Sequence, residues 1–428
     1  MTETDVTRPP AANRPPAARR TRARDTELRQ RARSVIPGGM YGHMSANALP
    51  PEYPQFYQRS EGSHVWDVDG NEYVDLMCSF GPIILGHKHP KVERAVAAQL
   101  AEGDTQAGPA ACMVEAAELL TDRVAHADWA MFAKNGTDAT TICLTIARAA
   151  TGRAKVLAAA GAYHGAAPWC TLRMDGVTAA DRANLIYYRF NDIASVRRAL
   201  DEADGDAAAI IVSPLRHDAG FDQELVDPRF ARELRALCDE AGAALVIDEV
   251  RAGFRMHDGG SWEPIGVAPD LSAWSKAIGN GYPLAAVLGS DPYRDAASRV
   301  FVTGSFWFQA APMAAAVATI TAIREEGAVP HMQRIGALLR DGLERQAAEA
   351  GVGIRQTGPV VMPNLAFDGD EGFARAKAFC AATVENGVLV HPRHNWFISA
   401  AHTDDDVARV LEATWEGFRA VRQQFGAA

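Results

Sequence analysis

Short, continuously apolar segments alternate with segments of helical periodicity through the middle of the chain. The apolar segments occupy residues 129–133, 154–158, 207–212, 243–247 and 284–288. Apolar runs of this length, without polar alternation, are typical of strands that are buried on both faces. Helical segments between them connect parallel neighbours in such folds. The rhythm therefore predicts an α/β fold in which helices cover a mostly parallel sheet, and ligands bind such sheets at the carboxyl ends of the strands.

The flanking segments differ from this region in composition. The first residues are rich in proline, alanine, arginine and threonine, which favours a disordered tail over a transit peptide or a nucleic-acid-binding arm. A helix is predicted from Thr26 to Val35, and the turn signal Asp69-Gly70-Asn71 predicts a hairpin. Near the C-terminus, strands are predicted at 353–355, 360–367, 388–391 and 396–400. We expect four parts: a disordered tail at residues 1–25 and an N-terminal segment at 26–80. These precede a large domain at 81–325 and a smaller α+β C-terminal domain at 326–428.

Composition excludes several classes of function. The net charge of −10 argues against general binding to nucleic acid or to an anionic membrane. The longest weakly polar stretch, 306–323, contains a glutamine and a proline, and it predicts a buried helix rather than a membrane span. The six cysteines are scattered without a C-x-x-C pair, so neither a zinc site nor a disulfide framework is indicated. We expect a cytoplasmic protein, since free thiols suit a reducing compartment.

A single lysine, Lys276, lies between an apolar segment and a glycine-containing turn, in L-S-A-W-S-K-A-I-G-N-G. Apolar surroundings disfavour the charged ammonium and lower its pKa, which makes the amine a nucleophile. Schiff-base chemistry requires such an amine. A lysine at a turn more often solvates a loop, so this motif alone does not decide between the two interpretations.

Two further features predict a site at the same sheet edge. Asn135-Gly136-Thr137 separates a predicted strand from a helix, where helix amides favour an anion such as phosphate, although simple helix capping is the alternative. Asp248 ends the strand A-A-L-V-I-D, where its carboxylate faces the crevice unless it caps a helix or forms an ion pair. A phosphate site, a carboxylate and an amine together match the needs of pyridoxal phosphate.

Together with G-A-Y-H-G at 161–165, I-D-E-V at 247–250 and S-K-A-I-G-N-G-Y-P at 275–283, these motifs resemble those of class III aminotransferases. The similarity is greatest to their glutamate-1-semialdehyde aminomutase-like branch, and it covers nearly all of the chain except the tail. It implies pyridoxal 5'-phosphate as cofactor. It also implies the fold type I architecture, with a mostly parallel seven-stranded sheet in the large domain, and a homodimer with shared active sites.

The resemblance also implies roles for individual residues. Lys276 is expected to form the Schiff base with the cofactor, and Asp248 to hold the ring nitrogen. The other cofactor-binding residues are expected at Asn135, Gly136, Thr137, Tyr163, Asp218, Val250 and Ser305. Among these, Tyr163 and Val250 are expected on the two ring faces, unless Tyr163 is a core residue. Ser305 is expected to reach the phosphate of the partner chain, unless it only caps a helix.

The chain departs from the aminomutase branch where that branch binds the substrate carboxylate. No arginine follows Pro37-Gly38-Gly39, and His43 is the residue that we expect to contact substrate, as a cation or as a hydrogen-bonding group. Other candidates for a carboxylate clamp are Arg216, Arg251 and Arg393.

We predict an aminotransferase that moves an amino group between an amino compound, such as a β- or ω-amino acid, and a keto acid. The alternative is an intramolecular aminomutase of the glutamate-1-semialdehyde type, which needs no separate keto acceptor. A dinucleotide-dependent oxidoreductase is disfavoured because Leu284 stands where G-x-G-x-x-G needs its third glycine. A catalytically silent homologue is disfavoured because both Lys276 and Asp248 are present.

Overall fold

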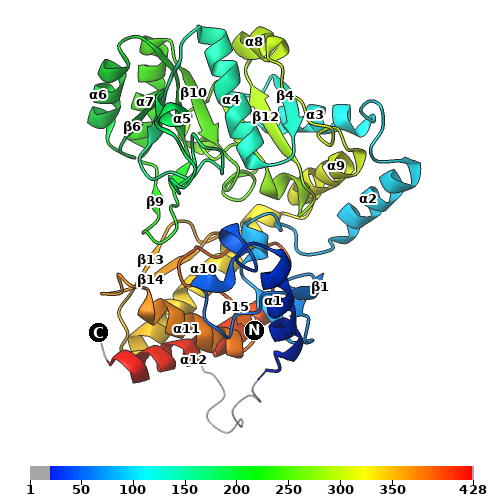
Figure 1. Cartoon of the computed structure of the whole chain (residues 1–428), viewed down its shortest axis with the longest axis vertical. Helices are drawn as coiled ribbons and strands as arrows, with labels where there is room; N and C mark the ends of the chain where they lie inside the picture. The colour runs from blue at the N-terminus through cyan, green and yellow to red at the C-terminus, as the bar shows by residue number, and fades with distance from the viewer. Residues whose placement is uncertain (1–19, 427–428) are drawn as a thin grey trace, which may run out of the picture.

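The computed structural model describes residues 20–426, and its largest sheet has seven strands (Figure 1). In spatial order these are β4 (Trp129–Ala133), β12 (Ala285–Gly289), β11 (Leu271–Trp274), β10 (Ala244–Asp248), β7 (Ala207–Val212), β5 (Lys155–Ala159) and β6 (Leu185–Tyr188). Strand β12 is antiparallel to both of its neighbours, and the other neighbouring pairs are parallel. The predicted mostly parallel seven-stranded sheet of an α/β fold is confirmed.

Helices cover both faces of this sheet, as the continuous apolar strands require. Val246 and Ile211 are buried in a cluster with residues of the helix at 136–151, whereas their chain neighbours Ile247 and Ile210 are buried in a cluster with residues of the helices at 193–203 and 228–241. Successive residues of one strand are therefore buried in the hydrophobic cores on opposite faces of the sheet. The helices of this region are α2 (Pro90–Glu102), α3 (Cys112–Arg123), α4 (Gly136–Thr151), α5 (Ala179–Arg182), α6 (Ile193–Ala203), α7 (Pro228–Ala241), α8 (Arg294–Arg299) and α9 (Ala310–Glu325).

A second group of elements combines the two ends of the chain (Figure 1). Strand β3 pairs in parallel with β15, so the N-terminal hairpin and a C-terminal strand share one four-stranded sheet. Its strands are β1 (Tyr57–Glu61), β2 (His64–Asp67), β3 (Glu72–Asp75) and β15 (Val388–Leu389). Around it lie α1 (Ala23–Val35), α10 (Ala328–Ala350), α11 (Ala374–Glu385) and α12 (Asp404–Phe425). Two small ribbons pair β8 (Leu215–Arg216) with β9 (Glu224–Leu225), and β13 (Ile354–Thr357) with β14 (Asn364–Phe367).

The first helix begins earlier than the sequence predicts. Helix α1 starts at Ala23, so the predicted boundary of a disordered tail at residue 25 is wrong, while the part of that prediction at residues 1–19 lies outside the described residues. Asp25 is the physical reason. Its buried carboxylate accepts hydrogen bonds from the N–H groups of Gln55 and Phe56 and from the Arg29 side chain. The four-part domain division otherwise stays a prediction.

The predicted strand at 396–400 does not form as a sheet strand. Its backbone N–H groups donate alternately to two different segments. Trp396 donates to the Pro363 carbonyl and Ile398 to the Val361 carbonyl, whereas Phe397, between them, donates to the Leu76 carbonyl. The segment is therefore held from both sides without a continuous ladder to either.

The weakly polar stretch before residue 323 is largely the buried helix α9, as predicted. Among the helices of residues 20–426, none combines the length and the apolar character that crossing a membrane requires.

Candidate active site

The structure brings Lys276 and Asp248 to the same edge of the central sheet. Asp248 is the last residue of β10, and it pairs with Ala273 of the parallel neighbour β11. Lys276 follows β11 after a single residue, Ser275, and is the first residue of a short 3-10 helix (Lys276–Gly279). Since neighbouring strands lie about 4.8 Å apart, both side chains start from one small region at the carboxyl ends of the strands.

The Lys276 amine is set in a protein environment that disfavours its charge. Burial lowers the pKa of Lys276 to about 7, with a further contribution from the Arg251 guanidinium that the Asp248 carboxylate opposes. The backbone of Lys276 is in the left-handed region, with φ of +47°, which a lysine adopts rarely and usually at a functional position. An amine with this pKa is largely available as a nucleophile at neutral pH.

Asp248 is oriented by a histidine that the sequence analysis did not single out. The Asp248 Oδ2 atom lies 2.7 Å from Nδ1 of His164, and Oδ1 accepts a hydrogen bond from the Val250 N–H at 3.1 Å. His164 is buried, its ring stacks against Trp169, and its Nε2 atom has no hydrogen-bond partner within the described part of the chain. His164 lies next to the predicted Tyr163, but 84 residues separate it from Asp248, so the sequence alone does not reveal their contact.

The predicted phosphate site coincides with the beginning of helix α4. Asn135 caps the helix, because its side-chain oxygen accepts from the N–H of Asp138 at 3.1 Å while the Asp138 carboxylate accepts from the N–H of Asn135. Gly136 lies so close to Val250 that an added Cβ would come within 2.7 Å of Val250 Cγ1. The Thr137 hydroxyl accepts from the Ala166 N–H at 3.1 Å. A helix N-terminus with this close backbone approach favours an anion.

Tyr163 and Asp218 lie near the same centre. Burial raises the pKa of Asp218 to about 6, and the Arg216 and Arg251 guanidinium groups oppose that shift. An added Cβ on Gly161 would lie 3.4 Å from Asp218 Oδ2, which places Asp218 against the G-A-Y-H-G loop. Burial also raises the pKa of Tyr163, and the Asp248 charge contributes. Tyr163 keeps 38% of its surface exposed, so it is not a core residue.

Of the three candidate arginine clamps, only Arg251 is buried. It donates to the His217 carbonyl at 3.1 Å and to Asn395 Oδ1 at 2.9 Å, and its charge acts on Lys276. Arg216 forms an ion pair with Glu224, and Arg393 is exposed and lies over the ring of Phe373.

His43 belongs to a group of aromatic side chains around Phe80. The His43 and Phe80 rings meet edge to face at 4.7 Å, and the rings of His394 and His391 lie 5.3 and 6.2 Å from Phe80. Burial lowers the pKa of His43, and the Lys276 charge lowers it further. Burial also lowers the pKa of His391, to about 4, and the pKa of His394. These imidazoles are therefore neutral near pH 7, and His43 is a hydrogen-bonding group there rather than a cation.

Ser305 lies in a different cavity from the other predicted site residues. It is exposed, and the cavity of about 180 Å³ that it lines is formed by residues 105–108 and by the segment from Thr303 to Gln309. The structure of one chain does not bring Ser305 to Lys276.

The residues at the sheet edge fit pyridoxal phosphate. The Lys276 amine, the Asp248 carboxylate and the N-terminus of α4 are the donor set that its aldehyde, ring nitrogen and phosphate require. Close approach at Gly136 and Gly165 supports this interpretation, since an added Cβ at Gly165 would lie 2.5 Å from Thr137 Oγ1.

Comparisons with known proteins agree with this geometry. The family model of class-III aminotransferases matches residues 46–404. The chain belongs to the class III aminotransferases. It is an aminotransferase that uses pyridoxal 5'-phosphate and moves an amino group from an amino donor to a keto acceptor.

Three similar proteins illustrate the relationship. The aminopentol aminotransferase of Sphingopyxis macrogoltabida is 50% identical, over 94% of this chain and 95% of that protein. The structure of the PLP internal aldimine form of the FumI protein from Sphingopyxis sp. MTA144 has a TM-score of 0.93 and 50% identity, and the match covers 94% of this chain and 97% of that one. The glutamate-1-semialdehyde 2,1-aminomutase of Roseiflexus castenholzii is 34% identical, over 93% and 98%. The chain is therefore less similar to this aminomutase than to the aminopentol aminotransferase.

Proposed function

We propose that Lys276 is the attachment point of the cofactor aldehyde and the proton carrier of the reaction. Bound pyridoxal phosphate supplies an electron sink for the amine-bearing carbon of the donor. Once the donor amine has taken the place of Lys276, the freed Nζ atom of Lys276 removes the proton from the amine-bearing carbon of the donor. The same Nζ atom then delivers this proton to the cofactor carbon that receives the amino group. The pKa of about 7 supports this role, because the amine can both accept and release a proton near neutral pH.

Asp248 and His164 keep the ring nitrogen protonated in this proposal. The short contact between His164 Nδ1 and Asp248 Oδ2 fixes the carboxylate and leaves its charge directed at the ring. Gly136 and Thr137 hold the phosphate at the start of α4, with Asn135 shaping the turn as the helix cap. Tyr163 and Val250 contact the two ring faces, and Asp218 lies near the ring hydroxyl.

We further propose a homodimer with shared active sites, in which Ser305 serves the phosphate of the partner chain. The segment around Ser305 exposes large aromatic side chains, with Phe301 93%, Phe306 60% and Phe308 40% exposed. Apolar side chains that gather in this way favour a protein interface. Sedimentation of the purified enzyme at several concentrations tests the dimer, and a monomer throughout would contradict it.

We propose that the amino donor is an amino alcohol rather than the β- or ω-amino acid expected from the sequence. His43, His391 and His394 are neutral, so the three imidazoles around Phe80 offer hydrogen bonds but no charge for a donor carboxylate. The name of the Sphingopyxis macrogoltabida relative also describes an amino alcohol as its substrate. Arg251 is then the cation that binds the carboxylate of the keto acid acceptor.

The cytoplasm is the compartment that we propose, because all six cysteines are buried free thiols.

The observation that carries the proposal is the lysine of lowered pKa beside the Asp248–His164 pair. Titration of the purified enzyme with amines and amino acids, followed by the absorbance of the bound cofactor, tests it. We expect amino alcohols to convert the cofactor to its amino form and a keto acid to restore the original spectrum. Conversion of one substrate without any keto acid would instead support an aminomutase. Unchanged turnover in Lys276→Ala would refute the assignment of the lysine.

A further inference from the structure

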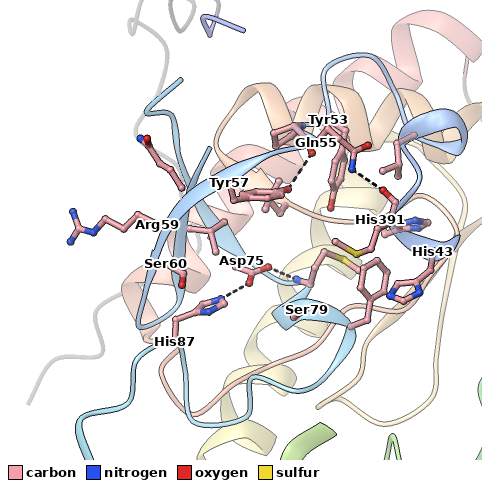
Figure 2. A pocket seen from close by; sticks show the side chains of 18 of the residues that line it. His43, Tyr53, Gln55, Tyr57, Arg59, Ser60, Asp75, Ser79, His87 and His391 are labelled. Carbon is pink, nitrogen blue, oxygen red and sulfur yellow. Dashed lines mark hydrogen bonds and ion pairs between the residues drawn. The ribbon is translucent and has the colours of Figure 1, made fainter. Parts of the chain in front are cut away.

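A cavity of about 420 Å³ lies under the N-terminal hairpin, next to the site described above (Figure 2). Its volume is within the range of about 300–1,000 Å³ that is typical of small-molecule sites. The apolar part of its wall comes from the N-terminal segment, strand β2, the turn after β3 and the end of β15, at Leu49, Tyr53, Val65, Met77, Phe80 and Leu389. The other end carries hydrogen-bonding groups and the cations Arg59 and Lys88, and Figure 2 shows Arg59, Ser60 and His87 there, away from His43 and His391.

One end of the cavity lies near the catalytic lysine. His43, Phe80 and His391 line that end, and the Lys276 charge lowers the pKa of His43. The residue after Phe80 lies against the lysine itself, since an added Cβ on Gly81 would lie 3.4 Å from Lys276 Cδ. A molecule whose amine is held at Lys276 can therefore extend past Phe80 into the cavity.

The backbone at this junction is strained. Cys78, Ser79 and Phe80 have consecutive φ angles of +45°, +54° and +64°, which residues other than glycine adopt rarely. Asp75 holds the turn, because its Oδ1 atom accepts from the N–H groups of Met77 and Cys78, while Oδ2 lies 2.8 Å from Nε2 of His87. Strain that the surroundings maintain in this way is a feature of functional positions, and here it sets the position of Phe80, which lines the cavity next to Gly81.

We propose that this cavity binds the alkyl chain of the donor amine, so that the enzyme selects long-chain amino alcohols. The apolar wall takes up the methylene groups, and hydroxyl groups on the chain meet Tyr57, Ser60 and His87. The inference rests on the proposed function and adds the substrate class: an amine on a long, hydroxyl-bearing chain.

The test uses the half-reaction of the holoenzyme with straight-chain amines from butylamine to decylamine, followed by cofactor absorbance, which needs no keto acid. Burial of one further methylene group corresponds to a gain of roughly fourfold in the second-order rate constant of the half-reaction. We expect this gain to accumulate along the series until the cavity is filled. In Leu49→Trp, which fills the cavity, the gain is lost for long amines.

Two further variants keep the test independent of folding defects. Gln58→Trp fills the cavity from the exposed strand β1 and is expected to act like Leu49→Trp. Leu338→Trp makes the same change at an exposed leucine of α10, and it is expected to keep the full dependence on chain length. Calorimetric titration with octanol gives a second readout, with binding to the wild type and to Leu338→Trp but not to Leu49→Trp.

The outcomes separate the two proposals. If all the amines react with equal rate constants, the aminotransferase stands and the cavity does not hold the chain. If Leu338→Trp and Leu49→Trp lose the chain-length dependence equally, the cavity proposal is also wrong. If no amine of the series reacts and octanol does not bind, the amino alcohol and the cavity both fail. If octanol binds in the expected pattern while no amine reacts, the cavity is apolar and accessible, but the donor does not place its chain there.

Discussion

Replacing Lys276 by methionine is expected to abolish turnover and, at the same time, to stabilise the cofactor-free protein. The lysine is a cation that folding takes out of water, and its pKa falls from 10.5 to about 7. Methionine has a similar length without the charge, so the folded chain no longer bears that cost. Function and stability are thus opposed at this position.

The magnitude follows from the difference between the two pKa values. Between pH 7 and 10.5 the unfolded chain binds more protons at this lysine than the folded chain, so wild-type stability rises with pH in that range. A difference of 10.5 − 7 = 3.5 units at about 1.36 kcal/mol each sets an upper limit of about 5 kcal/mol near pH 6. The same relation leaves about 2 kcal/mol at pH 9. Water that reaches the partly exposed side chain makes the real difference smaller.

Urea denaturation of the two apoproteins at pH 6, 7.5 and 9 provides the assay. We expect Lys276→Met to unfold at higher urea than the wild type, by a margin that shrinks steadily as the pH rises. Lys377→Met is the matched control, since Lys377 is exposed on α11 and its replacement should leave the urea midpoint unchanged at each pH. A Lys276→Met protein that is less stable than the wild type, or a margin that does not depend on pH, would refute the reasoning.

Four other substitutions test the rest of the site. Gly136→Ala forces a Cβ to within 2.7 Å of Val250 and should weaken cofactor affinity by at least about tenfold in equilibrium dialysis, whereas intact affinity would remove Gly136 from the phosphate site. Asp248→Asn keeps the shape but loses the charge, and it should lower kcat by roughly a hundredfold to a thousandfold with the fold intact by circular dichroism. His164→Gln should lower kcat less than Asp248→Asn does, and equal losses would mean that His164 does more than orient the carboxylate. Arg251→Met should raise KM for the keto acid but not for the amine, and equal effects on both would exclude a carboxylate clamp.

The apolar segments of the sequence located five of the seven strands, all but β6 and β11, and the pair of residues at the sheet edge. Asp248 ends one apolar strand and Lys276 comes just after the end of another, and in a parallel sheet such positions meet because the strand ends share one edge. The contact between His164 and Asp248 was out of reach, because no periodicity relates a loop residue to a strand end 84 positions away.

The N-terminal segment was harder to predict for a different reason. Asp25 sits in a polar, arginine-rich stretch that resembles a tail by composition, and its order depends on the amides of Gln55 and Phe56. The cavity near Lys276 was equally hidden, because β2, β3 and β15 form its wall only after distant parts of the chain meet. Local propensity describes such segments poorly when tertiary contacts determine their structure.

The pairing of β3 with β15 has a consequence for how the chain matures on the ribosome. Val74 pairs with Val388 in the sheet, so β3 cannot complete its pairing until the ribosome has added a further 388 − 74 = 314 residues. At about 5–20 residues per second this interval lasts roughly 15–60 s. During that time the hairpin lacks one neighbour, whereas the central sheet has all of its strands once Gly289, the end of β12, has been added. Assembly of the nascent enzyme should therefore finish with its two ends, and a late-acting chaperone has its best opportunity there.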